Sequence, residues 1–245
     1  MPRFFVPSDN FSDSEVRITG DDAFHIARAL RMAVGDSLTV CDMHGSEYSC
    51  VVTKIRDDEC TCDIISVSEG KTESPVFISL YMAYPKGDKL EVVTQKAVEL
   101  GASEIIPFES SRCVKKPKPE KAEKENLRLT RIAEEAAKQC GRSRLVKIQP
   151  SLSFSEMLTS ARSADAVLFC YEGDGARSLK DVLSSFDNNI KSIAVIVGSE
   201  GGFSLSEAAA ARDAGAYIVN LGPRILRCET APSYVLSSIS YRFEL

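Results

Sequence analysis

Runs of alternating or wholly apolar residues are separated by turn-forming residues in the first part of the chain. Residues 37–41, 47–55 and 60–67 form three such runs, each with the length and composition of a β-strand. Ahead of them, residues 22–32 place apolar side chains at helical spacing, namely Ala23, Ile26, Ala27 and Leu30. The pattern predicts a small antiparallel β-barrel with one helix.

The periodicity changes after a polar stretch at residues 70–75, where Gly70 and Pro75 interrupt regular structure. From there, apolar runs alternate with amphipathic segments. Strands are expected at residues 76–83, 104–108, 146–149, 166–171, 193–197 and 216–221. Two of these runs, 166–171 and 193–197, are almost continuously apolar, which is typical of parallel strands covered on both faces. The chain is thus predicted to hold a first domain at residues 1–72 and an α/β domain at residues 73–245.

Several helices of the second domain carry start and stop signals. Asp88, Ser153 and Ser204 each stand three residues before a glutamate, which is the spacing of a capping box. The helix after Asp88 is expected to stop at Gly101. A long charged helix is expected at residues 120–139.

Composition narrows the class of protein. Of 245 residues, 44% are hydrophobic and 27% are charged, as in an average globular protein. No apolar run reaches the roughly 18 residues that a membrane helix needs. The N-terminal segment has no signal-peptide core, so we expect a cytoplasmic protein without membrane contact. The eight cysteines and two histidines lack the spacing of metal ligands, which predicts free thiols and no metal site.

Charge is unevenly distributed along the chain. Residues 1–73 hold 7 basic and 14 acidic side chains, whereas residues 112–147 hold 12 basic and 5 acidic ones. The basic stripe is either a nucleic-acid contact or a solvated helix face with its neighbouring loops. Its candidate contacts are Lys115, Lys116, Arg142 and Arg144. Arg142 and Arg144 can instead serve as a basic helix end that complements the helix dipole.

Ligands of open α/β sheets bind beyond the carboxyl ends of the strands, so the loops after the late strands are candidate sites. Residues 197–203 follow a buried strand and contain three glycines within five positions. They match neither a Walker loop nor a dinucleotide fingerprint. The stretch is either a ligand-binding loop, which the glycines would let a ligand approach closely, or a plain turn.

The second candidate loop, residues 221–232, mixes apolar residues with arginines and one glutamate. Ile225 and Leu226 can flank a flat ring such as adenine while backbone groups read its edge. Alternatively, both fill the core and the arginines are solvated. Thr230 can cap the last helix, and Pro232 fits its first turn.

Three stretches of the chain resemble the RsmE family in sequence, order and spacing. The members of this family are 16S ribosomal RNA (uracil-N3)-methyltransferases of the SPOUT superfamily. The stretches are residues 139–142, 198–202 and 221–231, and residues 25–32 followed by Gly35 also look like that family's first domain. The similarity covers essentially the whole chain. One departure is Ser199, where the family usually has proline; we expect it to alter loop stiffness more than ligand chemistry.

The resemblance implies a PUA-like RNA-binding barrel followed by a parallel-sheet domain with a deep trefoil knot. It also implies a homodimer that methylates a uridine in 16S rRNA, within the small ribosomal subunit, using S-adenosylmethionine. The implied cofactor-binding residues are Gly198, Glu200, Gly201, Gly202, Leu221, Gly222, Ile225, Leu226 and Ala231.

Methylation at uracil N3 needs removal of an imide proton, positioning, and stabilisation of the resulting anion. Arg227 or Arg224 is the candidate to stabilise the anion or its phosphate. Glu229 is either the base, an orienting group or a structural partner of an arginine. In the first domain, Arg28 and Arg31 are candidate phosphate contacts. Two other functions remain open: a non-catalytic RNA-binding assembly factor, and a related enzyme that acts on another RNA such as tRNA.

Overall fold

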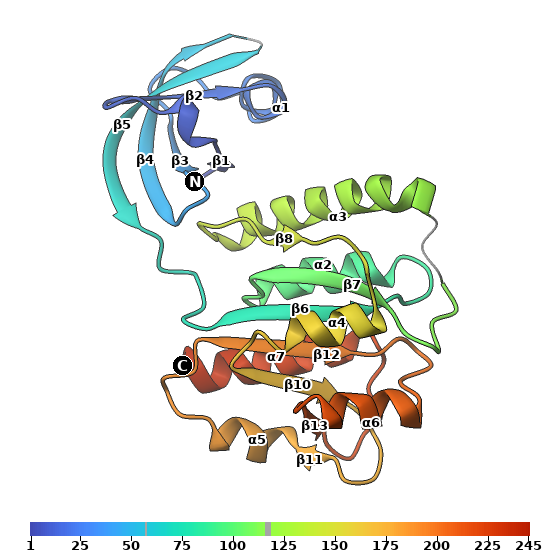
Figure 1. The fold of residues 1–245 in the computed structure, drawn as a ribbon. Coiled ribbons are helices and arrows are strands. Elements are labelled where there is room, and N and C mark those ends of the chain that lie inside the picture. Colours follow the sequence, from blue (N-terminus) through green and yellow to red (C-terminus); the bar gives the residue numbers. More distant parts are fainter. Residues whose placement is uncertain (57, 116–118) are drawn as a thin grey trace. The chain divides into compact units, whose positions relative to one another are not determined.

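A computed structural model of the chain describes residues 1–56, 58–115 and 119–245 (Figure 1). The chain divides into two compact units. The first unit contains residues 1–73 and 137–145, and the second contains residues 74–136 and 146–245. The boundary between residues 73 and 74 falls within the polar stretch at residues 70–75. The sequence pattern did not predict that residues 137–145 belong to the first unit.

The first unit contains a curled five-stranded sheet. Its strands are β1 (Arg3–Phe5), β2 (Glu15–Thr19), β3 (Ser37–Cys41), β4 (Ser46–Ile55) and β5 (Glu59–Glu69), in the order β1-β3-β4-β5-β2. A short 3₁₀ helix, η1 (Ser8–Asn10), precedes β2. The pairing of β4 with β5 shifts in register at two places, and Figure 1 shows both strands as curved.

The three strands expected from the sequence are present as β3, β4 and β5. The expected antiparallel pairing holds between β2, β3, β4 and β5, whereas β1 runs parallel to β3. Parallel neighbours need a long crossover connection, and residues 6–36 supply it. The sheet is therefore mixed. β1, with three residues, is too short to leave a periodic signal in the sequence.

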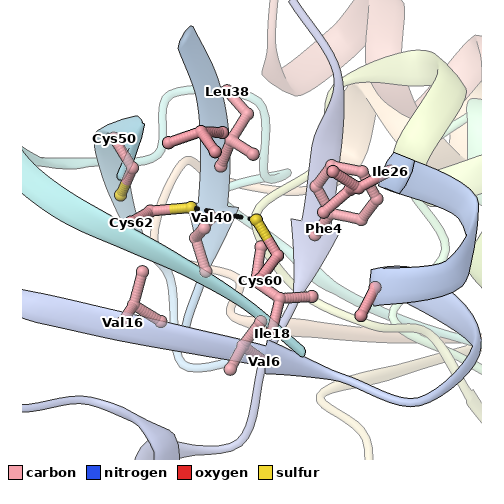
Figure 2. Close-up of a cluster of buried hydrophobic side chains, with 12 residues drawn as sticks. Phe4, Val6, Val16, Ile18, Ile26, Leu38, Val40, Cys50, Cys60 and Cys62 are labelled. Carbon is pink, nitrogen blue, oxygen red and sulfur yellow. Dashed lines mark hydrogen bonds between the residues drawn. The ribbon is translucent and has the colours of Figure 1, made fainter. Parts of the chain in front are cut away.

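Apolar side chains from all five strands and from the first helix form the core of this unit (Figure 2). They are Phe4, Val6, Val16, Ile18, Ala23, Ile26, Leu38, Val40, Cys50, Val52, Cys60 and Cys62. Because alternate residues of a strand face the same side, Cys60 and Cys62 both point inward, with their sulfurs 3.7 Å apart. All eight cysteines are free thiols. In the described ranges, no three His, Cys, Asp or Glu side chains form a group that could hold a metal ion.

The helix ahead of β3 begins as predicted but ends earlier. α1 (Asp21–Phe24) continues into a π-turn, η2 (His25–Ala29), where the Leu30 N–H donates to the His25 carbonyl at 2.9 Å. A π-turn adds a residue to the turn and rotates later positions off the apolar face. Ile26 is fully buried, whereas Leu30 is 41% exposed. The prediction of a regular helix over residues 22–32 was therefore wrong in its second half.

The second unit is an open parallel sheet. Its strands are β6 (Phe77–Ala83), β7 (Glu104–Glu109), β8 (Lys147–Ile148), β9 (Leu152–Ser153), β10 (Ala166–Cys170), β11 (Arg177–Ser178), β12 (Ser192–Val197) and β13 (Tyr217–Asn220). Their order is β11-β13-β10-β12-β6-β7-β8, and β9 also pairs with β7. Every one of these pairs is parallel. The predicted α/β class is confirmed.

Helices cover both faces of this sheet. They are α2 (Lys89–Glu99), α4 (Phe154–Ala161), α5 (Leu179–Ser185), α6 (Leu205–Asp213) and α7 (Thr230–Phe243). A further helix, α3 (Pro119–Cys140), belongs to the second unit up to residue 136 and to the first unit from residue 137 on. In Figure 1, α4 and α6 lie in front of the sheet and α2 and α7 behind it. The pairing registers set Val197 of β12 opposite Met82 of β6, and Ala83 opposite Phe108 of β7. The carboxyl ends of these central strands are therefore nearly level.

Two of the three predicted capping boxes are confirmed. Ser153 and Ser204 each accept the N–H of the glutamate three residues on, and that glutamate reaches back to the cap. The prediction for Asp88 was wrong, since its side chain makes no capping bond in the described structure. Asp88 has φ −96° and ψ 11° instead of the extended conformation in which a side chain reaches the first turn.

Candidate functional site

A cavity of about 550 Å³ opens at the carboxyl edge of the parallel sheet. It lies within the second unit and draws on the exits of five neighbouring strands, β13, β10, β12, β6 and β7. Its lining consists of Lys89 after β6, Arg112 after β7, residues 170–172 at β10, residues 197–203 at β12, and Val219, Leu221, residues 225–228 and Ala231 at β13. This is the edge at which open α/β sheets bind ligands.

The glycine loop, residues 198–202, is tightly folded upon itself. The Gly202 N–H donates to the Ser199 carbonyl at 2.9 Å, and Gly202 has φ +61°, a conformation that favours glycine. A Cβ on Gly198 would lie 3.1 Å from the Phe203 ring. A Cβ on Gly201 would lie 2.9 Å from the Arg112 carbonyl oxygen. The loop therefore needs these glycines for its own packing, whatever ligand it binds.

Glu207 joins the glycine loop to the exit of β7. Besides closing the capping box with Ser204, its carboxylate accepts the backbone N–H of Ser111 at 2.7 Å and the Ser111 hydroxyl at 2.8 Å. Burial by itself would raise the pKa of Glu207, but these hydrogen bonds outweigh it and lower the pKa. Glu207 is 7% exposed, so the joint between the two loops is rigid and largely shielded from water.

We expect Glu207→Ala to destabilise the fold by about 2–3 kcal/mol, because it removes a helix cap and leaves the Ser111 N–H without its acceptor. The matched control is Glu156→Ala, which opens the other capping box without touching a second loop and should cost about 1 kcal/mol. Denaturant unfolding measures both. Since the lowered pKa belongs to the folded state, the stabilisation by Glu207 is present above the unfolded pKa and is lost as the pH falls through the folded one. Equal losses in the two variants would contradict this role.

The second loop, residues 221–231, forms the opposite wall. Ile225 is 86% exposed beside the cavity, so it does not fill the core, and Leu226 is half-buried. The Arg227 carbonyl accepts the N–H groups of Thr230 and Ala231 and so starts α7. Thr230 is the first residue of α7, so the prediction that it caps this helix was wrong. Pro232 stands in the first turn, as expected.

An ion triad joins the two walls. The Lys89 ammonium lies 2.9 Å from a Glu200 carboxylate oxygen and 3.2 Å from a Glu229 carboxylate oxygen. Glu200 also accepts the backbone N–H of Lys86 at 3.1 Å. The Cys228 thiol donates to Glu229 at 3.2 Å. The β6 exit, the glycine loop and the second loop are thereby connected through one cation.

These contacts keep the carboxylates ionised. Burial alone would raise the pKa of Glu200, but hydrogen bonds from Lys89, from its own backbone and from the Lys86 N–H hold the pKa at about 2. The pKa of Glu229 is lowered by its own backbone N–H, then by Cys228 and Lys89. Burial, followed by the bond to Glu229, raises the pKa of Cys228 to about 12. A carboxylate with a lowered pKa is a weak proton acceptor, which favours an orienting role for Glu229.

One buried polar atom at the cavity has no partner. The Ser199 hydroxyl oxygen lacks a hydrogen bond in the described structure, although Ser199 is only 6% exposed. Buried polar groups are almost always paired, so this hydroxyl in the cavity wall is available to a bound ligand or an ordered water. Apolar side chains at Ile225 and Leu226 complete a site for a ligand that is partly flat and apolar and partly polar.

Most of the residues implied by the resemblance meet at this cavity. Of the cofactor candidates, Gly222 alone is outside its lining. Arg227 lines the cavity, Arg224 is exposed outside the lining, and Glu229 adjoins it through Lys89 and Cys228. Lys89, Arg112 and residues 170–172 were missed by the sequence reasoning. Their signal was available, because they follow strands whose ends meet at the same edge.

The RNA-binding candidates are dispersed. Arg142 is 5% exposed and pairs with Glu73, which also accepts the backbone N–H groups of Ser143 and Arg144. This buried ion pair with Glu73 differs from both roles that the sequence suggested for Arg142, the phosphate contact and the helix-dipole contact. The Arg144 side chain is exposed.

Of the other candidates, Lys115 pairs with Glu125 at 2.5 Å, and Lys116 lies outside the described residues. Arg28 belongs to η2. Arg31 has an unusual φ of +52°, and both side chains are exposed.

The fold and the cavity belong to a known class. Residues 72–240 match the family model of an RNA methyltransferase domain, and residues 18–65 match that of an RNA methyltransferase PUA domain. The chain is therefore an RNA methyltransferase by class. It is 34% identical over 251 residues to ribosomal RNA small subunit methyltransferase E of Bacillus subtilis, covering 100% of this chain and 98% of that protein. The chain belongs to the ribosomal RNA small subunit methyltransferase E family.

Other relatives agree in sequence and in structure. The methyltransferase E of Mycobacterium tuberculosis is 27% identical, over 96% of this chain and 90% of its own. A crystal structure of the Neisseria gonorrhoeae enzyme bound to S-adenosylmethionine superposes with a TM-score of 0.86 at 28% identity, over 99% and 98% of the two chains. A Legionella pneumophila methyltransferase in complex with the same cofactor gives 0.86 at 28% identity, over 98% and 96%. In the described ranges, no helix has the length and apolarity needed to cross a membrane.

Proposed function

We propose that this chain transfers a methyl group from S-adenosylmethionine to N3 of a uridine in 16S ribosomal RNA of the small subunit. The observation that carries the proposal is the single cavity formed by the glycine loop and the second loop. Membership of the methyltransferase E family and the cofactor in two similar structures support it. The reaction is placed in the cytoplasm, where the family's RNA substrate is assembled into ribosomes.

The residues present fit the cofactor. The orphaned Ser199 hydroxyl offers a polar contact in the wall, and Ile225 and Leu226 offer apolar surface for a nucleoside ring. The proposed binding residues are Gly198, Glu200, Gly201, Gly202, Leu221, Gly222, Ile225, Leu226 and Ala231. When bound, S-adenosylmethionine supplies a methyl group on a positively charged sulfur, which a deprotonated uracil N3 can accept.

The chain's own groups have three tasks in this proposal. Arg227, at the cavity, stabilises negative charge on the uracil ring as its N3 proton passes to solvent water. Glu229 is held ionised by Cys228 and Lys89 and orients the groups around it. Arg224, which is exposed on the second loop, contacts a phosphate of the bound RNA.

RNA recognition is assigned to both parts of the chain. We propose a PUA-like RNA-binding domain at residues 1–72 and a methyltransferase domain at residues 73–245, which carries the knot and the homodimer contacts that the resemblance implies. Lys115, Lys116, Arg144, Arg28 and Arg31 are the proposed phosphate contacts, with Arg142 as a residue that supports Arg144. The 12 basic residues of the 112–147 stretch favour it as the main electrostatic contact.

The test is mass spectrometry of small-subunit rRNA from cells that lack the gene. We expect one 3-methyluridine to disappear, and purified protein with S-adenosylmethionine to restore it on small subunits from those cells. A catalytically dead variant with unchanged RNA binding should not restore it. If methylation of 16S rRNA is unchanged and a methyl group is lost from tRNA, the substrate is tRNA and not 16S rRNA. No lost methyl group at all would overturn the enzymatic proposal.

A further inference from the structure

Lys89 is the one lysine in the cavity lining of the described structure, and it comes from neither of the two loops that the sequence singled out. It is the first residue of α2, which follows β6. Its ammonium bonds Glu200 on the glycine loop and Glu229 on the second loop, and its distance to the Cys228 sulfur is 3.9 Å. A third strand exit is thus linked by ion pairs to both cavity walls.

The charge balance makes this contact specific. Glu200 and Glu229 share one cation, and without it two neighbouring carboxylates would have no cation between them. Neighbouring like charges disfavour joint ionisation, so one of the two would hold a proton at higher pH. The other charged groups of the lining are Arg112, Glu172 and Arg227. Arg112 donates to the Gly201 carbonyl at 3.2 Å, which is a contact with the backbone of the glycine loop and not with these carboxylates.

The exposure of the triad separates a functional role from a purely structural one. The side chains of Lys89, Glu200 and Glu229 are 30%, 28% and 24% exposed. Ion pairs with this access to water contribute little to folding stability. A loss of Lys89 should therefore leave the melting temperature nearly unchanged while it changes the geometry of the cavity, and displacements of about an ångström are enough to slow a reaction strongly.

We propose that Lys89 is a positioning residue for methyl transfer, which fixes the spacing of the two cavity walls and the orientation of the Glu229 carboxylate. The inference rests on the proposed function and deepens it, because it assigns a task to a side chain outside the two loops. Lys89 acts through Glu200 and Glu229 and needs no contact with the transferred methyl group.

The test compares Lys89→Met and Lys89→Arg with a matched control, Lys96→Met. Lys96 lies on the same helix and pairs with Glu99 at 2.8 Å, away from the cavity lining. We expect Lys89→Met to lower kcat by about ten- to a hundredfold, with a smaller change in the KM for S-adenosylmethionine. The acidic limb of its kcat–pH profile should also lie at a higher pH than in the wild type, because one of the two carboxylates holds its proton to a higher pH. Lys89→Arg should restore most of the rate and the wild-type acid limb, and Lys96→Met should match the wild type.

The outcomes are separable from the proposed function. If the wild type methylates 16S rRNA but Lys89→Met has the wild-type kcat and pH profile, the positioning role is wrong and the function stands. If the wild type itself does not methylate, the function fails first. Should Lys89→Met melt at a lower temperature than Lys96→Met, the double variant Lys89→Met with Glu229→Gln decides. If Glu229→Gln lowers kcat by the same factor in the Lys89→Met background as in the wild type, Lys89 does not act through Glu229.

Discussion

Arg227→Ala should lower kcat for methyl transfer by about a hundredfold while S-adenosylmethionine affinity changes by less than about threefold. Arg227 lines the cavity, and its backbone carbonyl is built into the start of α7. Alanine keeps the backbone contact, so the helix start and the opposite wall remain in place. The loss is then one of charge at the reacting base, and single-turnover methylation with calorimetry of cofactor binding measures it.

Arg224→Ala is the matched comparison for Arg227→Ala. Both arginines belong to the same loop and are exposed, but Arg224 is not part of the cavity lining. We expect Arg224→Ala to raise the KM for RNA and to leave kcat within about threefold of the wild type, as for a phosphate contact. A larger fall in kcat for Arg224→Ala than for Arg227→Ala would reverse the assignment. A wild-type kcat for Arg227→Ala would remove it from the reaction.

Arg142→Met should destabilise the protein by about 3–5 kcal/mol, since it leaves Glu73 partly buried without its cation. The Arg142 and Glu73 side chains are 6% and 18% exposed, and they connect positions far apart in the sequence within the first unit. Burial by itself would raise the pKa of Glu73, but the bonds from Arg142, Ser143 and Arg144 lower it. The contribution is therefore present above the unfolded pKa and declines as the pH falls through the folded one.

The control for Arg142 is Arg144→Met, two residues further on. Arg144 is exposed, so we expect a change in unfolding free energy within about 0.5 kcal/mol and a weaker, less salt-dependent affinity for RNA. Denaturant unfolding and binding at several salt concentrations separate the two variants. If Arg142→Met folded as stably as the wild type and lost RNA binding, the direct phosphate contact that the sequence suggested would be correct after all.

Periodicity predicted those parts of the fold that depend on near neighbours in the chain. The buried strands β10 and β12 and the boxes at Ser153 and Ser204 follow from local pattern and are present. Local pattern failed where one residue changes the geometry. The π-turn at His25–Ala29 rotates Leu30 outward, and the backbone of Asp88 prevents its side chain from capping α2.

The candidate site was predictable to the extent that each contributor lies in a loop of distinctive composition. The glycine loop and the second loop were found in this way, and both line the cavity. Lys89 follows a predicted strand, and this indicates its place at the carboxyl edge of the sheet. Its contacts with Glu200 and Glu229, more than a hundred positions away, are carried by no local pattern. The same holds for Arg142, whose charge suggested RNA whereas its partner is Glu73.

In the proposed reaction, one cavity between the glycine loop and the second loop holds the methyl donor. A crystal structure of this chain with S-adenosylmethionine is the decisive measurement. We expect the cofactor between residues 198–202 and 221–226, with a hydrogen bond to the Ser199 hydroxyl and its nucleoside against Ile225 or Leu226. A cofactor ordered elsewhere on the protein, or a cavity left empty under saturating cofactor, would contradict it.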